Sequence, residues 1–263
     1  MTKNKINERT ENMGFFAGSG EYPAAGLYSL EHILILIFCF IVLIFTILIT
    51  RKKVKNPIKV IKIVSIVVLC FELMKVIWGT SVGRYSGWYD YLPLWFCSLF
   101  IPISIIAGFG KGKIQHTALT FMFYGGIVGG LVYLFCPTTS IGRYPVLHFI
   151  TFHSMFYHVL MLYMGYFIIY QGLLKPSIKD FKWYFIITTS FCIISFITNQ
   201  ILDTNYMFLS SYSNNPVLKT LYNLTGIFYP VIVTLGQNIG TFFVSFGGYK
   251  LFQFLISKKH NHN

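Results

Sequence analysis

Charged residues are scarce in this chain. They make up 11% of its 263 residues, whereas 55% are hydrophobic, far from the composition of an average soluble domain. The apolar residues form long blocks rather than short alternating stretches, which excludes a transmembrane β-barrel. The composition therefore excludes an ordinary soluble domain and indicates a helical membrane protein.

Cysteine pairs of the kind that bind metals are also lacking. The chain has five cysteines, which are Cys39, Cys70, Cys97, Cys136 and Cys192. They include no CxxC pair, and no histidine stands at the spacing of a zinc site. We therefore expect no bound metal.

Seven apolar blocks approach the roughly 20 residues that cross about 30 Å of hydrocarbon as a helix. They predict an all-α bundle of about seven transmembrane helices, at 28–50, 58–79, 92–109, 116–136, 147–171, 183–202 and 222–250. In the last block, Pro230 is expected to separate an outer collar from the crossing itself. We place the transmembrane domain at 27–252, between a polar tail (1–26) and a basic tail (253–263). The first tail has no apolar core of a cleavable signal peptide.

Lysine and arginine are divided unequally between the two sides of this bundle. Fourteen lie in the loops around 51–62, 111–113 and 175–182 and at the C-terminal end, and six lie on the opposite side. The positive-inside rule places the N-terminus outside and the C-terminus in the cytoplasm. We predict a multi-pass protein of the cell membrane, and assign the net charge of +13 to the membrane surface rather than to nucleic acid.

With this orientation, polar side chains from every span fall at one level in the outer leaflet. They include His32, Glu72, Cys97, His148, His153, Tyr157, Asn199 and Gln200. Ionisable residues within a span are costly and usually face a cavity or a partner. The set therefore predicts an outward-facing cup, and the alternative is that each side chain only pairs two helices. In the last span, Gln237, Asn238, Thr241 and Ser245 continue a polar stripe inward.

Cys97 lies in the stretch Tyr91-Leu92-Pro93-Leu94-Trp95-Phe96-Cys97-Ser98-Leu99. A proline is tolerated in the first turn of a helix, so we expect a helix to begin here and to hold the thiol near its outer end. The thiol is a buried apolar group, a disulfide partner of Cys136, or a nucleophile activated by His153. The residues alone leave these three interpretations open.

Five stretches of the chain resemble one family. They are 29–32 (SLEH), 92–99 (LPLWFCSL), 123–126 (FYGG), 152–154 (FHS) and 203–209 (DTNYMFL). From about residue 27 to 250, the chain resembles the YwaF-like bacterial integral membrane proteins, which are similar to the eukaryotic transmembrane protein 164. The resemblance is most specific at 92–99 and 203–209.

The resemblance implies a cysteine-dependent acyltransferase that moves a fatty acyl chain from a phospholipid to a lysophospholipid without coenzyme A. By motif position it places the cysteine at Cys97, the histidine at His153 and a further family-like histidine at His32. Trp95 stands where the family usually has a histidine. The role of that histidine is then either absent or supplied by another residue, such as His32 or His148.

The predicted function is a transacylase of the outer leaflet that needs no cofactor. Its partners are membrane phospholipids, with a lysolipid or a lipoprotein as the acceptor. The supporting residues are Asn199, Gln200, Asn205 and Tyr206 as oxyanion donors, Glu72 as a partner of a histidine or Lys75, and Arg84 and Arg143 as phosphate ligands. The alternative is a non-catalytic protein that binds or transports a lipid or small molecule, supported by the polar stripe of the last span.

Overall fold

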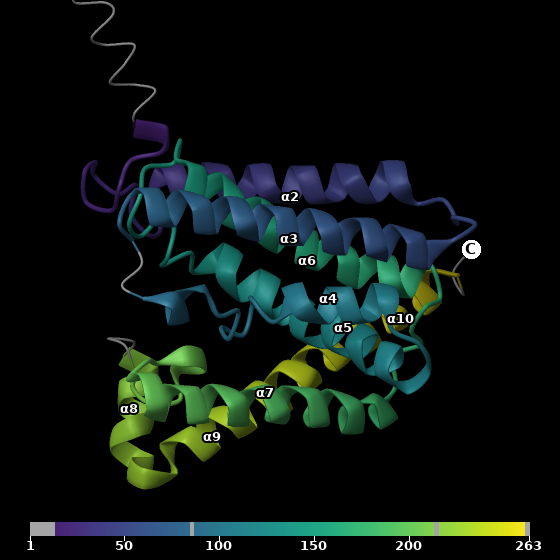
Figure 1. The fold of residues 1–263 in the computed structure, drawn as a ribbon. Coiled ribbons are helices and arrows are strands. Elements are labelled where there is room, and N and C mark those ends of the chain that lie inside the picture. Colours follow the sequence, from purple (N-terminus) through teal and green to yellow (C-terminus); the bar gives the residue numbers. More distant parts are fainter. Residues whose placement is uncertain (1–13, 85–86, 213–215, 261–263) are drawn as a thin grey trace, which may run out of the picture. The chain divides into compact units, whose positions relative to one another are not determined.

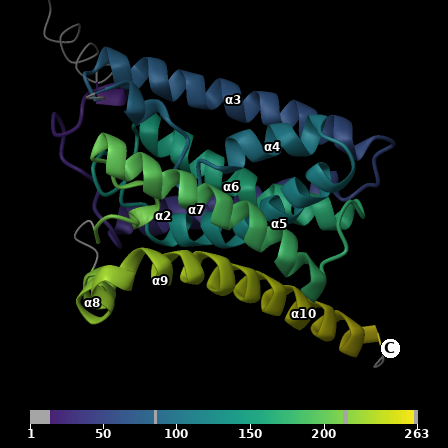
Figure 2. The same ribbon diagram turned by 60° about the horizontal axis from the view of Figure 1, so that its bottom comes forward.

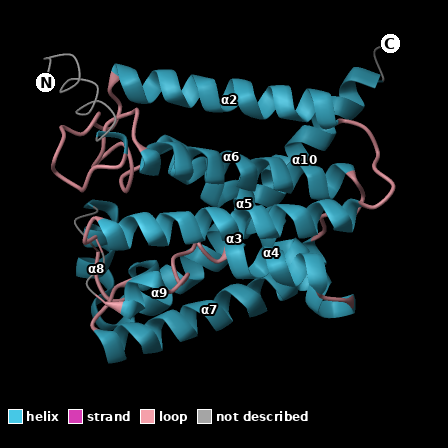
Figure 3. Ribbon diagram, turned by 45° about the horizontal axis from the view of Figure 1, so that its top comes forward, coloured by secondary structure: helices cyan, strands magenta, loops and turns pink. Residues whose placement is uncertain are grey.

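The computed structural model describes residues 14–84, 87–212 and 216–260, and within these ranges the chain forms helices and no strand (Figures 1 and 3). The α-helices are α2 (Leu30–Thr50), α3 (Pro57–Ser81), α4 (Phe100–Phe109), α5 (Gly112–Phe135), α6 (Phe149–Tyr170), α7 (Phe181–Leu202), α8 (Pro216–Thr225), α9 (Tyr229–Leu235) and α10 (Thr241–His260). The predicted all-α class is confirmed. Residues 1–13 and 261–263 of the predicted tails lie outside the described residues.

Five helical stretches of the described chain are long and apolar enough to cross a membrane. They are Leu30–Thr50, Gly112–Phe135, Phe149–Tyr170, Asp180–Leu202 and Val217–Leu255. Two predicted spans are not among them: 58–79 forms α3, and 92–109 yields only the ten-residue α4. The structure therefore shows five candidate crossings, where the sequence predicts about seven.

The helix predicted from residue 92 begins instead at Phe100. A proline pushes the residue before it out of the helical region, and Leu92, which precedes Pro93, is extended with φ −66° and ψ 128°. Pro102, in the first turn of α4, occupies the position that the sequence analysis gave to Pro93. A proline there costs little, because the first amides of a helix lack intrahelical partners.

Contacts divide the chain into two compact units. The first unit comprises 1–52, 64–92 and 129–163, and the second comprises 53–63, 93–128 and 164–263. The division falls within α3, α5 and α6, so each of these helices contributes to both units. At the C-terminal end, α10 continues to His260, past the predicted domain boundary at residue 252.

The first unit is built on an aromatic core of Trp78, Tyr144, Phe149 and Ile150. The segment before α2 packs on this core, because Trp78 Nε1 donates to the Phe16 carbonyl at 2.9 Å. The amides of residues 25 and 26 also donate to the 141–144 loop. The described part of the predicted polar tail is thus integral to the first unit. By contrast, α2 buries only three side chains and exposes a long apolar surface, as a lipid-facing helix does.

The second unit ends in a long segmented helix. After α8, Gly226 has a positive φ of 51°, and α9 starts anew with Pro230 in its first turn. The predicted division of the last span near Pro230 is confirmed. A π-helix at Gly236–Gly240 joins α9 to α10, and Figure 2 shows the two running on as one bent helix.

Gly130 of α5 makes a close contact in the first unit. A Cβ at Gly130 would lie 2.9 Å from Leu162 Cδ2 and 3.0 Å from the His158 carbonyl oxygen. This is the small-residue packing that lets two membrane helices approach.

We expect Gly130→Ala to lower the thermal stability of the purified protein by several degrees, because overpacking of this size costs about 1–3 kcal/mol. Gly247→Ala in α10 is the matched control, since its Cβ would meet no atom within 4 Å. Unfolding of both variants in detergent, followed by tryptophan fluorescence, checks the prediction. An equal midpoint for the two variants would refute the close contact.

Candidate functional site

Cys97 lies on a tight turn that leads into α4. The Leu99 amide donates to the Trp95 carbonyl, and the Phe100 amide donates to the Cys97 carbonyl, both at 3.1 Å. The Cys97 side chain is half-buried. The thiol is therefore carried by the turn at the N-terminal end of α4, and not by the face of a helix as the sequence analysis predicted.

Trp95 connects this turn to the segment that contains Asp203–Leu209. Its ring lies edge-to-face on Tyr206 at 5.6 Å and on Phe208 at 5.4 Å between ring centroids. A hydrogen bond from Ser195 Oγ to the Leu94 carbonyl, at 3.4 Å, adds a second link to α7. The two stretches that carry the most specific resemblance thus pack together in the second unit.

The Asp203–Leu209 segment holds three non-glycine residues in the left-handed region. Asp203 has φ 49°, Met207 has φ 56° and Phe208 has φ 58°. Such conformations cost of order 1–3 kcal/mol each and persist only where the surroundings enforce them. They are a frequent feature of functional sites.

The side chains of Asn199 and Asn205 hold the backbone of this segment by hydrogen bonds. The Asn199 side chain accepts from the Tyr206 amide at 2.7 Å and from Thr204 Oγ1 at 2.9 Å, and donates to the Tyr206 carbonyl at 3.1 Å. Asn205 accepts from the amides of Ser210 and Ser211, and donates to Ser211. Both amide groups are engaged in holding this segment, and the oxyanion role predicted for them stays a prediction. Of the other two predicted donors, Tyr206 is buried and Gln200 is exposed.

Gln237 is a member of the site to which the sequence analysis gave no role. Its Nε2 donates to the Met207 carbonyl at 2.9 Å, and its Oε1 lies 3.6 Å from Cys192 Sγ, which also contacts Met207 Sδ at 3.6 Å. Gln237 lies on the π-helix, a feature often found at functional sites. The polar stripe of the last span was the signal that pointed to it.

The rest of that stripe pairs helices of the second unit. Asn238 Nδ2 donates to Thr189 Oγ1 at 3.2 Å, Thr241 Oγ1 bonds the Tyr184 hydroxyl at 2.5 Å, and Ser245 Oγ donates to a backbone carbonyl of α5 at 2.7 Å. These bonds agree with the helix-pairing interpretation of the stripe. They give no support to a path for a transported molecule.

His153 keeps a buried lone pair in the first unit. Its side chain is 5% exposed, and Nε2 lies 3.1 Å from the Phe71 carbonyl oxygen. Because a carbonyl only accepts, Nε2 carries the proton and Nδ1 carries the lone pair. Nδ1 is buried and has no hydrogen-bond partner among the described residues. The ring is also stacked parallel to Tyr157, with centroids 6.3 Å apart. This tautomer leaves Nδ1 able to accept a proton.

His32 and His148 use both ring nitrogens for structure. His148 Nε2 donates to the Ala17 carbonyl and Nδ1 accepts from the Ile150 amide, both at 3.1 Å. His32 Nδ1 accepts from the Tyr28 amide at 3.0 Å, and Nε2 donates to the Leu134 carbonyl at 3.1 Å. Neither ring keeps a nitrogen for the role of the histidine that Trp95 replaces.

His158 resembles His153 in its bonding, although the sequence analysis gave it no role. Its Nδ1 lies 2.6 Å from the Ser154 carbonyl, and its buried Nε2 has no partner within the described chain. The ring stacks on Tyr133 with centroids 3.7 Å apart. A histidine that faces the backbone of its own helix leaves no sequence signal that separates it from an exposed one.

The charged residues of the predicted site all belong to the first unit. Glu72 pairs with Lys75 at 2.5 Å, which is one of the two partners predicted for it. The Arg84 guanidinium lies over the Trp78 ring at 5.5 Å from its centroid, whereas Arg143 is exposed.

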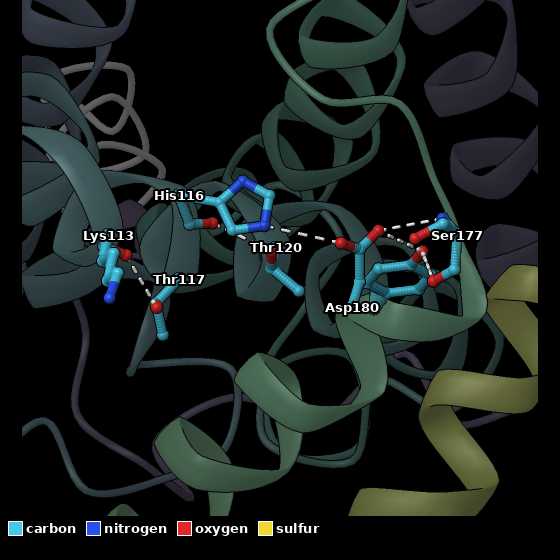
Figure 4. A network of polar contacts seen from close by, with 7 residues as sticks. Lys113, His116, Thr117, Thr120, Ser177 and Asp180 are labelled. Atoms are coloured by element: carbon cyan, nitrogen blue, oxygen red, sulfur yellow. Dashed lines mark hydrogen bonds and ion pairs between the residues drawn. The ribbon is translucent and has the colours of Figure 1, made fainter.

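A separate polar network in the second unit surrounds Asp180 (Figure 4). Its nearly buried carboxylate accepts from the Tyr124 hydroxyl at 3.1 Å and from the Ser177 amide at 2.9 Å, and lies 3.4 Å from His116 Nε2. The network fixes the start of α7 against α5 and includes none of the predicted site residues.

The structure thus gathers the predicted residues in two groups. Trp95, Cys97 and the 199–206 residues belong to the second unit, and the histidines, Glu72 and the arginines belong to the first. The pairing of Cys97 with His153 stays a prediction. All five cysteines lie in the described part of the chain and none forms a disulfide, so the disulfide with Cys136 is not found.

A family model described as the TMEM164 family matches residues 27–251. No curated protein and no solved structure matches the chain. The match confirms the likeness to transmembrane protein 164 over the span that the sequence motifs indicated, although the YwaF-like name is not part of it. Together with the five apolar helices, it makes this a membrane protein.

We expect Asn199→Ala to destabilise the Asp203–Leu209 segment, because the substitution leaves the buried Tyr206 amide without its acceptor at a cost of about 1–3 kcal/mol. The exposed neighbour Gln200→Ala is the control and should change stability by no more than about 0.5 kcal/mol. Hydrogen exchange of residues 203–211 measures the effect. Unchanged protection in N199A would show that Asn199 does not hold the segment.

His148 generates a prediction about pH. Burial lowers the pKa of its imidazole below the ordinary value of 6.5, and the charge of Arg84 lowers it further, although the bond to Ala17 opposes both. Above pH about 6.5 the ring is neutral in both the folded and unfolded states. As the pH falls below that value, the unfolded chain takes up a proton that the folded chain refuses, so stability falls by up to about 1.4 kcal/mol per pH unit until the folded pKa is reached.

Thermal unfolding between pH 7.5 and 5 of the wild type and of His148→Gln checks this. The variant is expected to be less stable at pH 7.5 but to lose less on acidification, because glutamine does not titrate. Parallel pH curves for the two proteins would contradict the assignment.

Proposed function

The chain belongs to the TMEM164 family, and from that premise we propose that it is a membrane-embedded transacylase. It transfers a fatty acyl chain from a phospholipid to a lysolipid or a lipoprotein without coenzyme A. The observation that carries the proposal is the packing of Trp95, two residues before Cys97, on Tyr206 and Phe208. This contact joins two distant stretches through a strained segment, which is an arrangement typical of a functional site.

In the first half-reaction, Cys97 Sγ attacks the ester carbonyl of the donor phospholipid. The thiol proton passes to the lone pair of His153 Nδ1 as the S–C bond forms, and the carbonyl oxygen becomes an oxyanion. Collapse of this intermediate breaks the C–O bond to the glycerol oxygen, which takes the proton back from His153. The products are an acyl thioester on Cys97 and a lysolipid.

In the second half-reaction, the hydroxyl of a lysolipid or the N-terminal amine of a lipoprotein attacks the thioester carbonyl and gives a proton to His153 Nδ1. The C–S bond breaks, and the thiolate regains the proton. The acyl chain passes from the donor ester through the thioester to a new ester or amide, so the exchange needs neither a nucleotide nor coenzyme A. The bond from His153 Nε2 to the Phe71 carbonyl favours the imidazolium that forms in both halves.

The position of Cys97 favours negative charge at the reacting centre. The turn immediately precedes the first residue of the ten-residue α4, and the N-terminal end of a helix carries partial positive charge. We assign stabilisation of the oxyanion to the exposed side-chain amide of Gln200. The positive-inside rule places the reaction in the outer leaflet of the cell membrane.

We expect Cys97→Ala to abolish transfer, and His153→Gln to slow it by about 10²–10⁴-fold, the usual contribution of a general base. Cys70→Ala is the matched control, because Cys70 is an exposed thiol on α3. Proteoliposomes with a fluorescent phospholipid donor and an unlabelled lysolipid acceptor report the transfer. Equal unfolding midpoints would show that the variants are folded. Transfer by folded C97A at the wild-type rate would remove Cys97 from the mechanism.

A further inference from the structure

An apolar groove of about 300 Å³ lies in the first unit. It is lined by Phe16, Met74, Ile77, Trp78, Ser81 and Phe149. Met74 and Ile77, on α3, are 51% and 70% exposed, so the groove opens toward the surroundings of that helix. Its volume is at the lower end of the range for ligand sites, which suits one acyl chain rather than two.

Arg84 lies beside this groove, three residues after the end of α3. Its guanidinium is over the ring of the groove residue Trp78 at 5.5 Å and over Tyr144 at 6.0 Å. Its backbone amide donates to the Gly79 carbonyl at 2.8 Å, which fixes the chain at this point. The arginine is thus held in place by aromatic faces, as a positioned guanidinium often is.

One end of this guanidinium lacks a partner. Arg84 Nη1 is buried and makes no hydrogen bond to any described residue. A buried charged donor without an acceptor is costly, so the arrangement favours an anionic ligand that supplies one. A phosphate matches the planar fork of a guanidinium.

We propose that the groove holds one acyl chain of a phospholipid whose phosphate pairs with Arg84. The six mostly apolar residues of the groove suit the acyl chain. The Arg84 guanidinium, whose Nη1 lacks an acceptor among the described residues, suits the phosphate of the headgroup. A lipid is the occupant because the groove borders the exposed apolar side chains of α3 in a membrane protein. The proposal concerns binding alone and does not depend on the transfer reaction.

Native mass spectrometry of the full-length protein in detergent tests the site. The probes are 1-palmitoyl lysophosphatidylglycerol and monopalmitoylglycerol, which share a chain but differ in the phosphate. All variants carry Cys97→Ala, so that acyl transfer cannot consume the probe. Failure of the catalytic proposal therefore leaves this result unaffected.

Arg84→Gln is expected to weaken binding of the phosphate-bearing probe by about tenfold and to leave binding of monopalmitoylglycerol unchanged. Arg51→Gln is the matched control, because it removes the same charge from an exposed side chain of the same unit. Ser81→Phe, which fills the groove, should weaken both probes. Arg84→Lys, which keeps the charge, should recover part of the loss if R84Q is folded.

Three results would overturn the proposal. The first is equal binding of the phosphate-bearing probe by R84Q and the parent protein. The second is an equal loss in R51Q, which would indicate attraction by net charge. The third is unchanged binding of both probes by S81F, which would place the chain elsewhere.

Discussion

Backbone polar groups must find partners where water is absent, and in a membrane only helices satisfy themselves without help. This chain breaks its helices at Leu92–Leu99 and at Asp203–Leu209. Each break is stabilised by side chains of the second unit: Ser195 bonds the first, and Asn199, Asn205 and Gln237 bond the second. The Trp95 ring, in the first break, packs on Tyr206 and Phe208 in the second. The position of the Cys97 thiol depends on these bonds.

The length of the apolar blocks was enough to predict the fold class and several helices. The block 28–50 became α2 (Leu30–Thr50), and 147–171 became α6 (Phe149–Tyr170). The block 92–109 failed because it contains two prolines at positions that both suit a helix start. Only the backbone shows that Pro93 follows an extended residue, Leu92, and that Pro102 lies in the first turn of α4. Hydrophobicity does not distinguish them.

The sequence proposes residues for the candidate site, and the structure shows which partners some of them bind. A buried amide can hold an oxyanion or a strained backbone, and the sequence does not distinguish the two. The bonds from Asn199 to Tyr206 and Thr204 are seen only in the structure. The depth of His153 stays a prediction from the loop charges. The proton on Nε2 follows from the Phe71 carbonyl, which no sequence pattern indicates. Gln237 lies on a π-helix and donates to the Met207 carbonyl. The polar stripe in the sequence does not indicate a π-helix.

The central claim is that Cys97 carries the acyl chain between donor and acceptor. Wild-type protein incubated with a radiolabelled phospholipid, without acceptor, and quenched in acid tests it directly by peptide mapping. The account predicts label on the peptide that contains Cys97, released by neutral hydroxylamine and discharged when a lysolipid is added before the quench. Transfer of label to the acceptor with no labelled Cys97 peptide at any time would contradict it.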